Sequence, residues 1–177
     1  MTAMSVVTTE TPFYGIAHTV PITYMAMPSF SQLKQVFGKS RVSVIFDGRL
    51  FEHHFTCTHA SLRSGDRDFI VMAQPTGRSS WTGDEIIKQA RAIRDDHAPN
   101  GYRPAMAIEV YQYFKSERRR YQGIRSIARL VGLGSYATMD GGRYAAAIHT
   151  IGYRPSFEHR YFTEITAGDE HYLFVKI

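Results

Sequence analysis

The predicted fold is decided by residues 115–131, which read Lys-Ser-Glu-Arg-Arg-Arg-Tyr-Gln-Gly-Ile-Arg-Ser-Ile-Ala-Arg-Leu-Val. A strand-like run, residues 105–114, enters this stretch, and a helix is expected from Gly123 to residue 131. The i, i+3, i+4, i+7 spacing of one buried helix face is met by Ile124, Ile127, Ala128 and Val131. The pattern therefore predicts a strand, a glycine and a helix in that order.

Positive charge is concentrated in the same stretch. Six basic residues against one acidic residue give it a net charge of +5, which equals the net charge of the whole chain. The first turn of a helix has N–H groups without internal partners, and a glycine lets a ligand approach the backbone. The stretch therefore predicts an anion site at Gly123, with the alternative of a solvated helix face. Its cations are Lys115, Arg118, Arg119, Arg120, Arg125 and Arg129.

Composition places the chain among ordinary globular proteins. Its 177 residues are enough for one domain with a sizeable core. The one cysteine, Cys57, excludes an internal disulfide framework and favours a reducing compartment. No run approaches the ~20 apolar residues of a membrane span, and the N-terminus lacks the pattern of a signal peptide. We therefore expect a cytoplasmic protein with no membrane partner.

The rest of the chain predicts an α+β fold, an α/β sandwich with a central mixed, mostly antiparallel sheet flanked by helices. Capping signals at Ser29 and Thr82 mark two helix starts, and Asp47-Gly48 marks a hairpin turn. Helices are expected at residues 30–37, 83–97 and 142–151. Strands are expected at residues 18–27, 41–46, 50–57, 69–73, 157–165 and 171–177, the last two joined as a closing hairpin.

Glu109 is the candidate general base. In the expected strand it shares a face with Ala107, Tyr111 and Tyr113. A carboxylate between aromatic rings in a half-buried strand has its pKa raised toward the range of a base. The alternative is a glutamate that faces solvent or pairs with an arginine.

A metal site is not expected. His53, Cys57 and His59 would project from one face of a strand, and zinc accepts such ligands. Their spacing matches no tight ligand motif, however, and a fourth ligand is not evident. The favoured interpretation is a strand with partly buried histidines.

The second part of the chain resembles the GNAT superfamily of N-acetyltransferases. The family signature, Q/R-x-x-G-x-G/A, follows a strand and opens a helix, and its backbone amides hold the pyrophosphate of acetyl-CoA. Residues 120–125, Arg-Tyr-Gln-Gly-Ile-Arg, match the signature at the first and fourth positions. The resemblance implies a single GNAT-like domain over residues 1–177. Residues 1–104 would form a divergent N-terminal half, and residues 105–177 the acyl-CoA-binding-like half.

The resemblance also implies an activity, the transfer of an acetyl group from acetyl-CoA to the amine of an unidentified acceptor. Glu109 would act as the base, and Tyr144 would replace the tyrosine that protonates the departing thiolate in the family. A backbone N–H near Tyr113 or Phe114 would polarise the thioester carbonyl. The other cofactor-binding residues would be Arg118, Arg120, Tyr121, Gln122, Gly123, Ile124, Arg125 and Ser126.

Three departures from the family pattern favour a second hypothesis. Arg125 replaces a small residue, Gly141 stands where the family often has an asparagine, and Ile148 occupies the place of the tyrosine. GNAT-like proteins of tailed phages have similar endings. The chain would then be a non-catalytic structural or accessory protein, viral in origin, that binds a protein or a nucleic acid through its basic stretch. A third hypothesis is plain polyanion binding, which weakens steeply with salt. A homodimer stays open.

Overall fold

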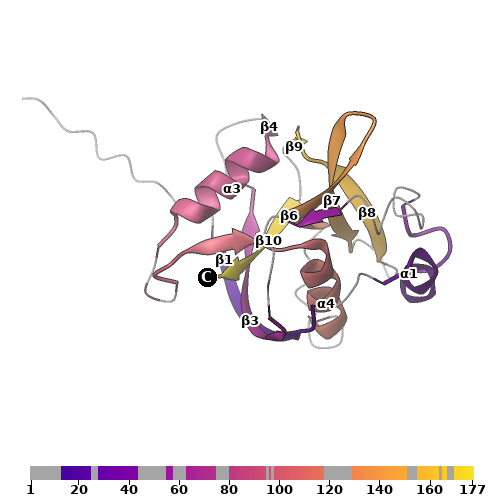
Figure 1. The fold of residues 1–177 in the computed structure, drawn as a ribbon. Helices are drawn as coiled ribbons and strands as arrows, with labels where there is room; N and C mark the ends of the chain where they lie inside the picture. Colours follow the sequence, from indigo (N-terminus) through magenta and orange to yellow (C-terminus); the bar gives the residue numbers. More distant parts are fainter. Residues whose placement is uncertain are drawn as a thin grey trace, which may run out of the picture.

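The computed structural model describes residues 13–24, 28–43, 55–57, 63–74, 80–94, 96, 98–117, 129–150, 155–163, 165–166 and 170–177. Their helices (Figure 1) are α1 (Phe30–Phe37), α3 (Gly83–Ala92) and α4 (Ala107–Glu117). Their strands are β1 (Phe13–Ile22), β2 (Phe55–Cys57), β3 (Gly65–Ala73), β4 (Ser80–Trp81), β5 (Tyr102–Pro104), β6 (Arg129–Met139), β7 (Gly142–His149), β8 (Ser156–Tyr161), β9 (Ile165–Thr166) and β10 (Glu170–Lys176).

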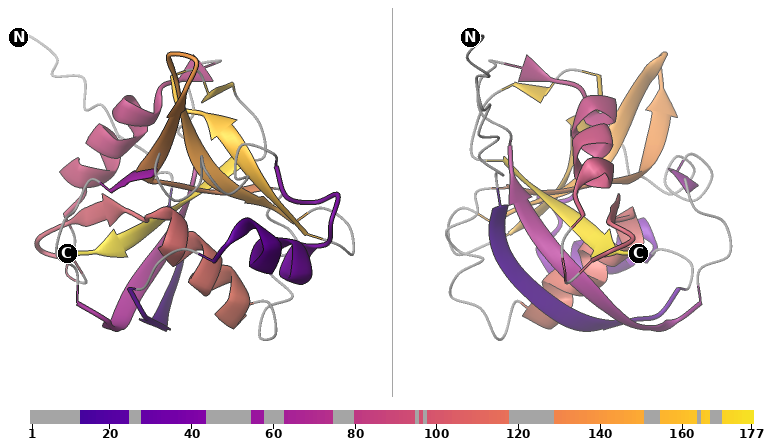
Figure 2. Two further views of the ribbon diagram at one scale, coloured as in Figure 1. Left: turned by 45° about the vertical axis from the view of Figure 1, so that its right-hand side comes forward. Right: turned by 90° about the vertical axis from the view of Figure 1, so that its left-hand side faces the viewer.

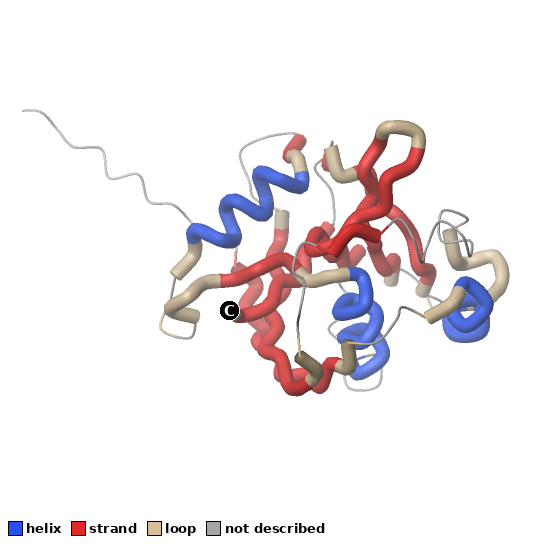
Figure 3. Tube along the Cα trace, viewed as in Figure 1, coloured by secondary structure: helices blue, strands red, loops and turns tan. Residues whose placement is uncertain are grey.

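Eight of these strands form one sheet (Figure 3). Its order is β1-β3-β10-β6-β7-β8, with β5 also paired to β10 and β2 to β6, while β4 and β9 form a separate pair. Among the strands of the described residues, only β6 and β10 pair in parallel. The outline of the expected α+β fold, a mixed and mostly antiparallel sheet with helices, is confirmed. The closing hairpin is wrong, because β8 pairs with β7 and β10 lies between β3 and β6.

The two faces of the sheet carry separate hydrophobic cores. On β10, Leu173 and Val175 belong to the core shared with α1 and α4, whereas Tyr172 and Phe174 belong to the core shared with α3. This alternation is the two-residue period of a strand. The rotated views show α4 and α3 on opposite sides of the sheet (Figure 2). Because both faces of β10 are covered, its apolar residues follow one another without polar interruptions.

Residues 107–117 form helix α4, so the strand expected at 105–114 is wrong. Almost every position of the segment is buried, Glu109 and Tyr113 included. A two-residue period and a helical period therefore fit its apolar residues equally well. The start of the helix is secured elsewhere in the fold, since Ala107 N donates a hydrogen bond of 2.8 Å to Ser135 Oγ. One buried helix face consists of Ala107, Val110, Tyr111 and Phe114.

Residues 129–149 form the hairpin β6–β7, so the helices expected at 123–131 and 142–151 are wrong over the residues that the structure describes. Asp140 and Gly141 have φ angles of 49° and 76°, as in the two-residue turn that suits the twist of a hairpin. Gly134, just beyond the helix expected at residues 123–131, lies inside β6. A Cβ there would lie 2.5 Å from the carbonyl oxygen of Pro104, so glycine allows the chain that enters α4 to cross β6.

The two helix starts with local capping signals are confirmed. Ser29 caps α1, and Thr82 forms a capping box at the start of α3, which ends at Ala92 instead of residue 97. The strands expected at 69–73 and 171–177 lie in β3 and β10. The strand expected at 157–165 ends at Tyr161, and that expected at 18–27 ends at Ile22. Residues 44–54, with the Asp47-Gly48 turn, lie outside the described residues.

Candidate functional site

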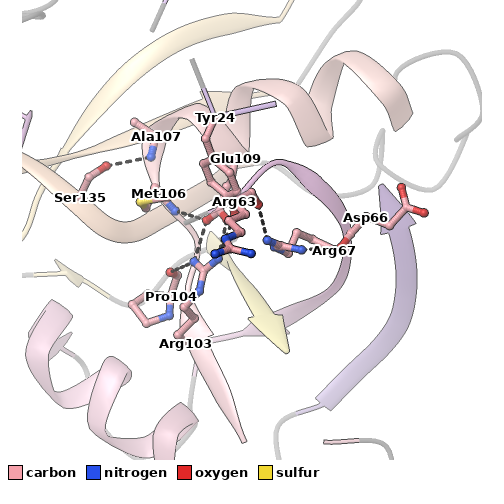
Figure 4. A network of polar contacts seen from close by, with 10 residues as sticks. All are labelled: Tyr24, Arg63, Asp66, Arg67, Arg103, Pro104, Met106, Ala107, Glu109 and Ser135. Atoms are coloured by element: carbon pink, nitrogen blue, oxygen red, sulfur yellow. Dashed lines mark hydrogen bonds and ion pairs between the residues drawn. The ribbon is translucent and has the colours of Figure 1, made fainter. Parts of the chain in front are cut away.

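Glu109, the predicted base, lies at the centre of a buried polar network (Figure 4). Its Oε1 lies 2.6 Å from Nη2 of Arg103 and accepts a hydrogen bond from the hydroxyl of Tyr24. Its Oε2 accepts hydrogen bonds from Nη1 of Arg103 at 2.9 Å and from the backbone N of Met106 at 2.8 Å. The carboxylate therefore connects the first turn of α4 both to β5 and to the residues that follow β1.

Within this network Glu109 is closed off from solvent, so it cannot act as a general base on a substrate. Glu109 is 0% exposed and Arg103 is 5% exposed, so neither reaches a substrate in solvent. Burial opposes the charge of Arg103, but the hydrogen bonds and charge of Glu109 outweigh it and raise the pKa of the guanidinium. Burial, together with the hydrogen bond to Glu109, raises the pKa of Tyr24. The alternative of an arginine-paired glutamate is confirmed.

The predicted phosphate cradle lies outside the described residues, and its described flanks differ from those expected. Helix α4 leads into it and strand β6 leads out of it, so the strand-to-helix order of the signature is absent from these flanks. Tyr113 and Phe114 are buried inside α4, where backbone N–H groups serve the helix. Acetyl-CoA binding itself stays a prediction. The residues outside the description are Arg118, Arg120, Tyr121, Gln122, Gly123, Ile124, Arg125 and Ser126.

Arg129, the last cation of the basic stretch, belongs to a compensated ion-pair cluster. Its Nη1 lies 3.0 Å from Oε1 of the buried Glu170, which Arg160 also contacts. Tyr172 donates a hydrogen bond of 3.2 Å to the other oxygen of Glu170, and Glu158 lies 3.6 Å from Nε of Arg129. Two arginines and two glutamates balance one another. The cluster therefore connects three strands, β6, β8 and β10, and offers no net charge to an anion.

Tyr144, the predicted proton donor, lies in a group of three rings where β7 and β8 pair. Its ring centroid lies 5.3 Å from that of His159 and 5.2 Å from that of Tyr161, both in edge-on geometry. Tyr161 is 45% exposed. A Cβ on Gly142 would lie 2.9 Å from the ring of Tyr161, so the glycine makes space for this ring. Tyr144 therefore packs against these two rings. Glu109, the other predicted catalytic residue, has its partners in the separate buried network.

Positive charge lies beside the three rings. Residues 28–43 contain three basic residues and no acidic residue. They are attached to β8, because the ring of Phe37 lies 5.5 Å from that of Phe157 and the carbonyl of Arg41 accepts a hydrogen bond of 2.8 Å from the N–H of Phe157. We call the basic residues and the two tyrosines the α1–β8 surface. It consists of Lys34, Lys39, Arg41, Tyr144 and Tyr161.

Ser43 and His159 form a hydrogen-bonded pair next to this surface. Ser43 Oγ lies 2.6 Å from Nδ1 of His159, and the backbone N of Ser43 donates a hydrogen bond of 2.9 Å to the carbonyl of Phe157. Partial burial lowers the pKa of His159, so the imidazole is neutral at pH 7. A neutral imidazole has one nitrogen that accepts a proton. No sequence motif links these two residues, which are 116 positions apart.

Comparisons with protein-family models, with curated proteins and with solved structures give no match for this chain. Among the described residues, no helix has the length and apolar character needed to span a membrane. The same residues contain no group of three or more side chains that could hold a metal ion. His53 and His59 lie outside the described residues.

Proposed function

We propose that this chain binds single-stranded nucleic acid through the α1–β8 surface. The exposed ring of Tyr161 carries the proposal. An aromatic ring on a sheet surface accepts a stacked base of any sequence, and such stacking contributes about 1–3 kcal/mol per base. Tyr144 packs edge-on against Tyr161 and limits its motion, which reduces the entropy lost when a base stacks on it.

The cations beside the rings are placed for the phosphate backbone. Lys39 is exposed, and Lys34 and Arg41 are half-buried. Arg41 is hydrogen-bonded to Phe157, at the opposite end of β8 from Tyr161. At about 3.3 Å per residue, Phe157 and Tyr161 are separated by roughly 13 Å. A short single strand therefore reaches both the ring and the cations. The local charge favours the same class of partner, because residues 28–43 carry three basic residues and no acidic one.

Two substitution sets test this interface. Tyr161→Ala should weaken binding of a short labelled RNA or DNA strand by about 5–150-fold, the equivalent of ~1–3 kcal/mol. Lys34→Ala with Lys39→Ala should reduce the magnitude of the slope of log K against log salt by up to about 1.4, since single strands give ~0.7 per phosphate contact. Fluorescence anisotropy at several salt concentrations measures both effects.

The matched control removes two cations from the other side of the sheet. Lys88 and Arg91 are exposed on α3, so the Lys88→Ala, Arg91→Ala variant loses the same charge away from the α1–β8 surface. We expect it to bind nearly as the unsubstituted chain does. An equal loss in both double variants, or unchanged affinity in Tyr161→Ala, would show that binding is diffuse or lies elsewhere.

Acetyl-CoA-dependent acyl transfer stays a prediction of the resemblance. The buried, arginine-paired Glu109 does not support it, because it is closed to a substrate amine. Calorimetric titration with acetyl-CoA tests it directly. The nucleic-acid proposal shares its class of partner with the second sequence hypothesis, but it uses the α1–β8 surface instead of the basic stretch at residues 115–131.

A further inference from the structure

The Ser43–His159 pair has a chemical capacity that nucleic-acid binding alone does not use. The imidazole is neutral at pH 7 and hydrogen-bonded at Nδ1. If Nδ1–H donates to Ser43 Oγ, the lone pair of Nε2 is free to accept a proton. Tyr144 on β7 packs against the ring of His159, and the charged groups that act on it are its strand neighbours Glu158 and Arg160, which project from the opposite face of β8.

We propose that His159, positioned by Ser43, cleaves single-stranded RNA that lies on the α1–β8 surface, without a metal ion. This inference rests on the proposed binding function and identifies RNA as the substrate. His159 would be the catalytic residue, because its Nε2 touches the reacting hydroxyl. Ser43 would be a positioning residue, because it holds the imidazole in one tautomer and orientation.

The chemistry of the pair favours RNA over an ester substrate. Ser43 as a nucleophile would need N–H donors for an oxyanion, and its own backbone N–H is engaged with the carbonyl of Phe157. RNA brings its own nucleophile, the 2′-hydroxyl. A base and a fixed position for the adjacent phosphate are therefore enough to promote the reaction.

The step balances without an added reactant. His159 Nε2 accepts the proton of the 2′-hydroxyl, the 2′-oxygen forms a bond to the adjacent phosphorus, and the bond from phosphorus to the 5′-oxygen breaks. The departing 5′-oxygen takes a proton from water, and the imidazolium returns its proton to the resulting hydroxide. The products are a 2′,3′-cyclic phosphate and a 5′-hydroxyl. DNA, which lacks the 2′-hydroxyl, would bind without being cut.

The experiment incubates the full chain with a labelled single-stranded RNA, or with the DNA of the same sequence, in the presence of EDTA. The unsubstituted chain should cut RNA alone and leave a cyclic phosphate, with a half-maximal rate below pH 6.5, the ordinary pKa of histidine. His159→Asn retains a polar group near Ser43 but lacks the base, and should cut about 10²–10⁴-fold more slowly. Ser43→Ala should slow cutting, and Ser43→Thr, which restores the hydroxyl, should recover it.

Binding is measured on the same samples by anisotropy, and folding by thermal melting. Binding of RNA without cutting, or cutting by His159→Asn at the unsubstituted rate, overturns this inference and leaves the proposed binding function standing. Absence of binding to both RNA and DNA overturns both. Equal cutting by Ser43→Ala and the unsubstituted chain overturns the positioning role of Ser43.

Discussion

The substitution Glu109→Gln tests the buried network that closes Glu109, the predicted base, off from solvent. Glutamine keeps the size of the side chain and an oxygen for the N–H of Met106, but it removes the charge opposite Arg103. Because Arg103 is 5% exposed, its guanidinium would stay buried without an opposing charge. Removing one partner of a buried ion pair costs about 3–5 kcal/mol. We expect the free energy of unfolding to fall by this amount, a large part of the ~5–15 kcal/mol of a typical domain.

Urea unfolding at pH 7, followed by circular dichroism, measures the change from the midpoint and the m-value. Asp68→Asn is the control, because Asp68 is 49% exposed and 4.0 Å from Lys176, and an exposed pair contributes less than about 1 kcal/mol. The Arg103→Met, Glu109→Gln double variant should be more stable than Glu109→Gln alone, since it leaves no unpaired charge. A loss in Glu109→Gln no larger than in Asp68→Asn would refute the reasoning.

Gly134→Ala should lower the melting temperature more than Gly141→Asn does, because a Cβ at Gly134 meets backbone at 2.5 Å, whereas Gly141 has no atom within 4 Å and asparagine tolerates its positive φ. Calorimetry compares them, and equal shifts would argue against the crossing of β6. Stability should also decline above about pH 10. Burial, and after it the hydrogen bond and charge of Glu109, raise the pKa of Tyr24 in the folded state above its unfolded value of 10.0. The stability that the protonated hydroxyl contributes is therefore present below pH 10 and is lost as the pH rises through the higher folded-state pKa. Urea titrations at several alkaline pH values should show a shallower decline in Tyr24→Phe, and an unchanged decline would exclude Tyr24 as a source.

Features that depend on a few neighbouring residues could be predicted from the sequence. The starts of α1 and α3 follow from a serine or threonine that accepts a hydrogen bond from a backbone N–H three residues later. The turn at Asp140-Gly141 carried an equally local hairpin signal, but the helix expected directly after it, at residues 142–151, was wrong. The residues that follow alternate, with Ala145 in one core and Ala146 in the other.

Helix α4 could not be assigned from its own residues. Tyrosine, phenylalanine and valine favour strands, and the burial of nearly all its positions removes the polar face that marks a helix. The contacts that fix its start come from other strands. Ser135 of β6 accepts from Ala107, and Arg103 of β5 pairs with Glu109. Such contacts exist only once the sheet is formed, so tertiary packing decides the conformation of this segment.

Part of the candidate site could be predicted from the sequence. Pairing with an arginine was one of the predicted states of Glu109, although the contribution of Tyr24, 85 positions away, was not predictable. Tyr144 was selected as a substitute proton donor because Ile148 occupies the family position, and the structure packs it against two rings instead. The Ser43–His159 pair depends on residues 41–43 lying against β8, a long-range pairing that no local pattern encodes.

The buried network and the α1–β8 surface are separate in chemistry but connected by packing. The ring of Phe37 lies 5.5 Å from that of Phe114 in α4 and 5.5 Å from that of Phe157 in β8, so α1 is held between the two elements. A substitution that loosens α4 would therefore also displace the cations of α1 and weaken binding indirectly. For this reason, Tyr161, which is exposed, is a sharper test of nucleic-acid binding than Glu109. Lower affinity in Glu109→Gln would follow from lost stability even if Glu109 never meets a ligand.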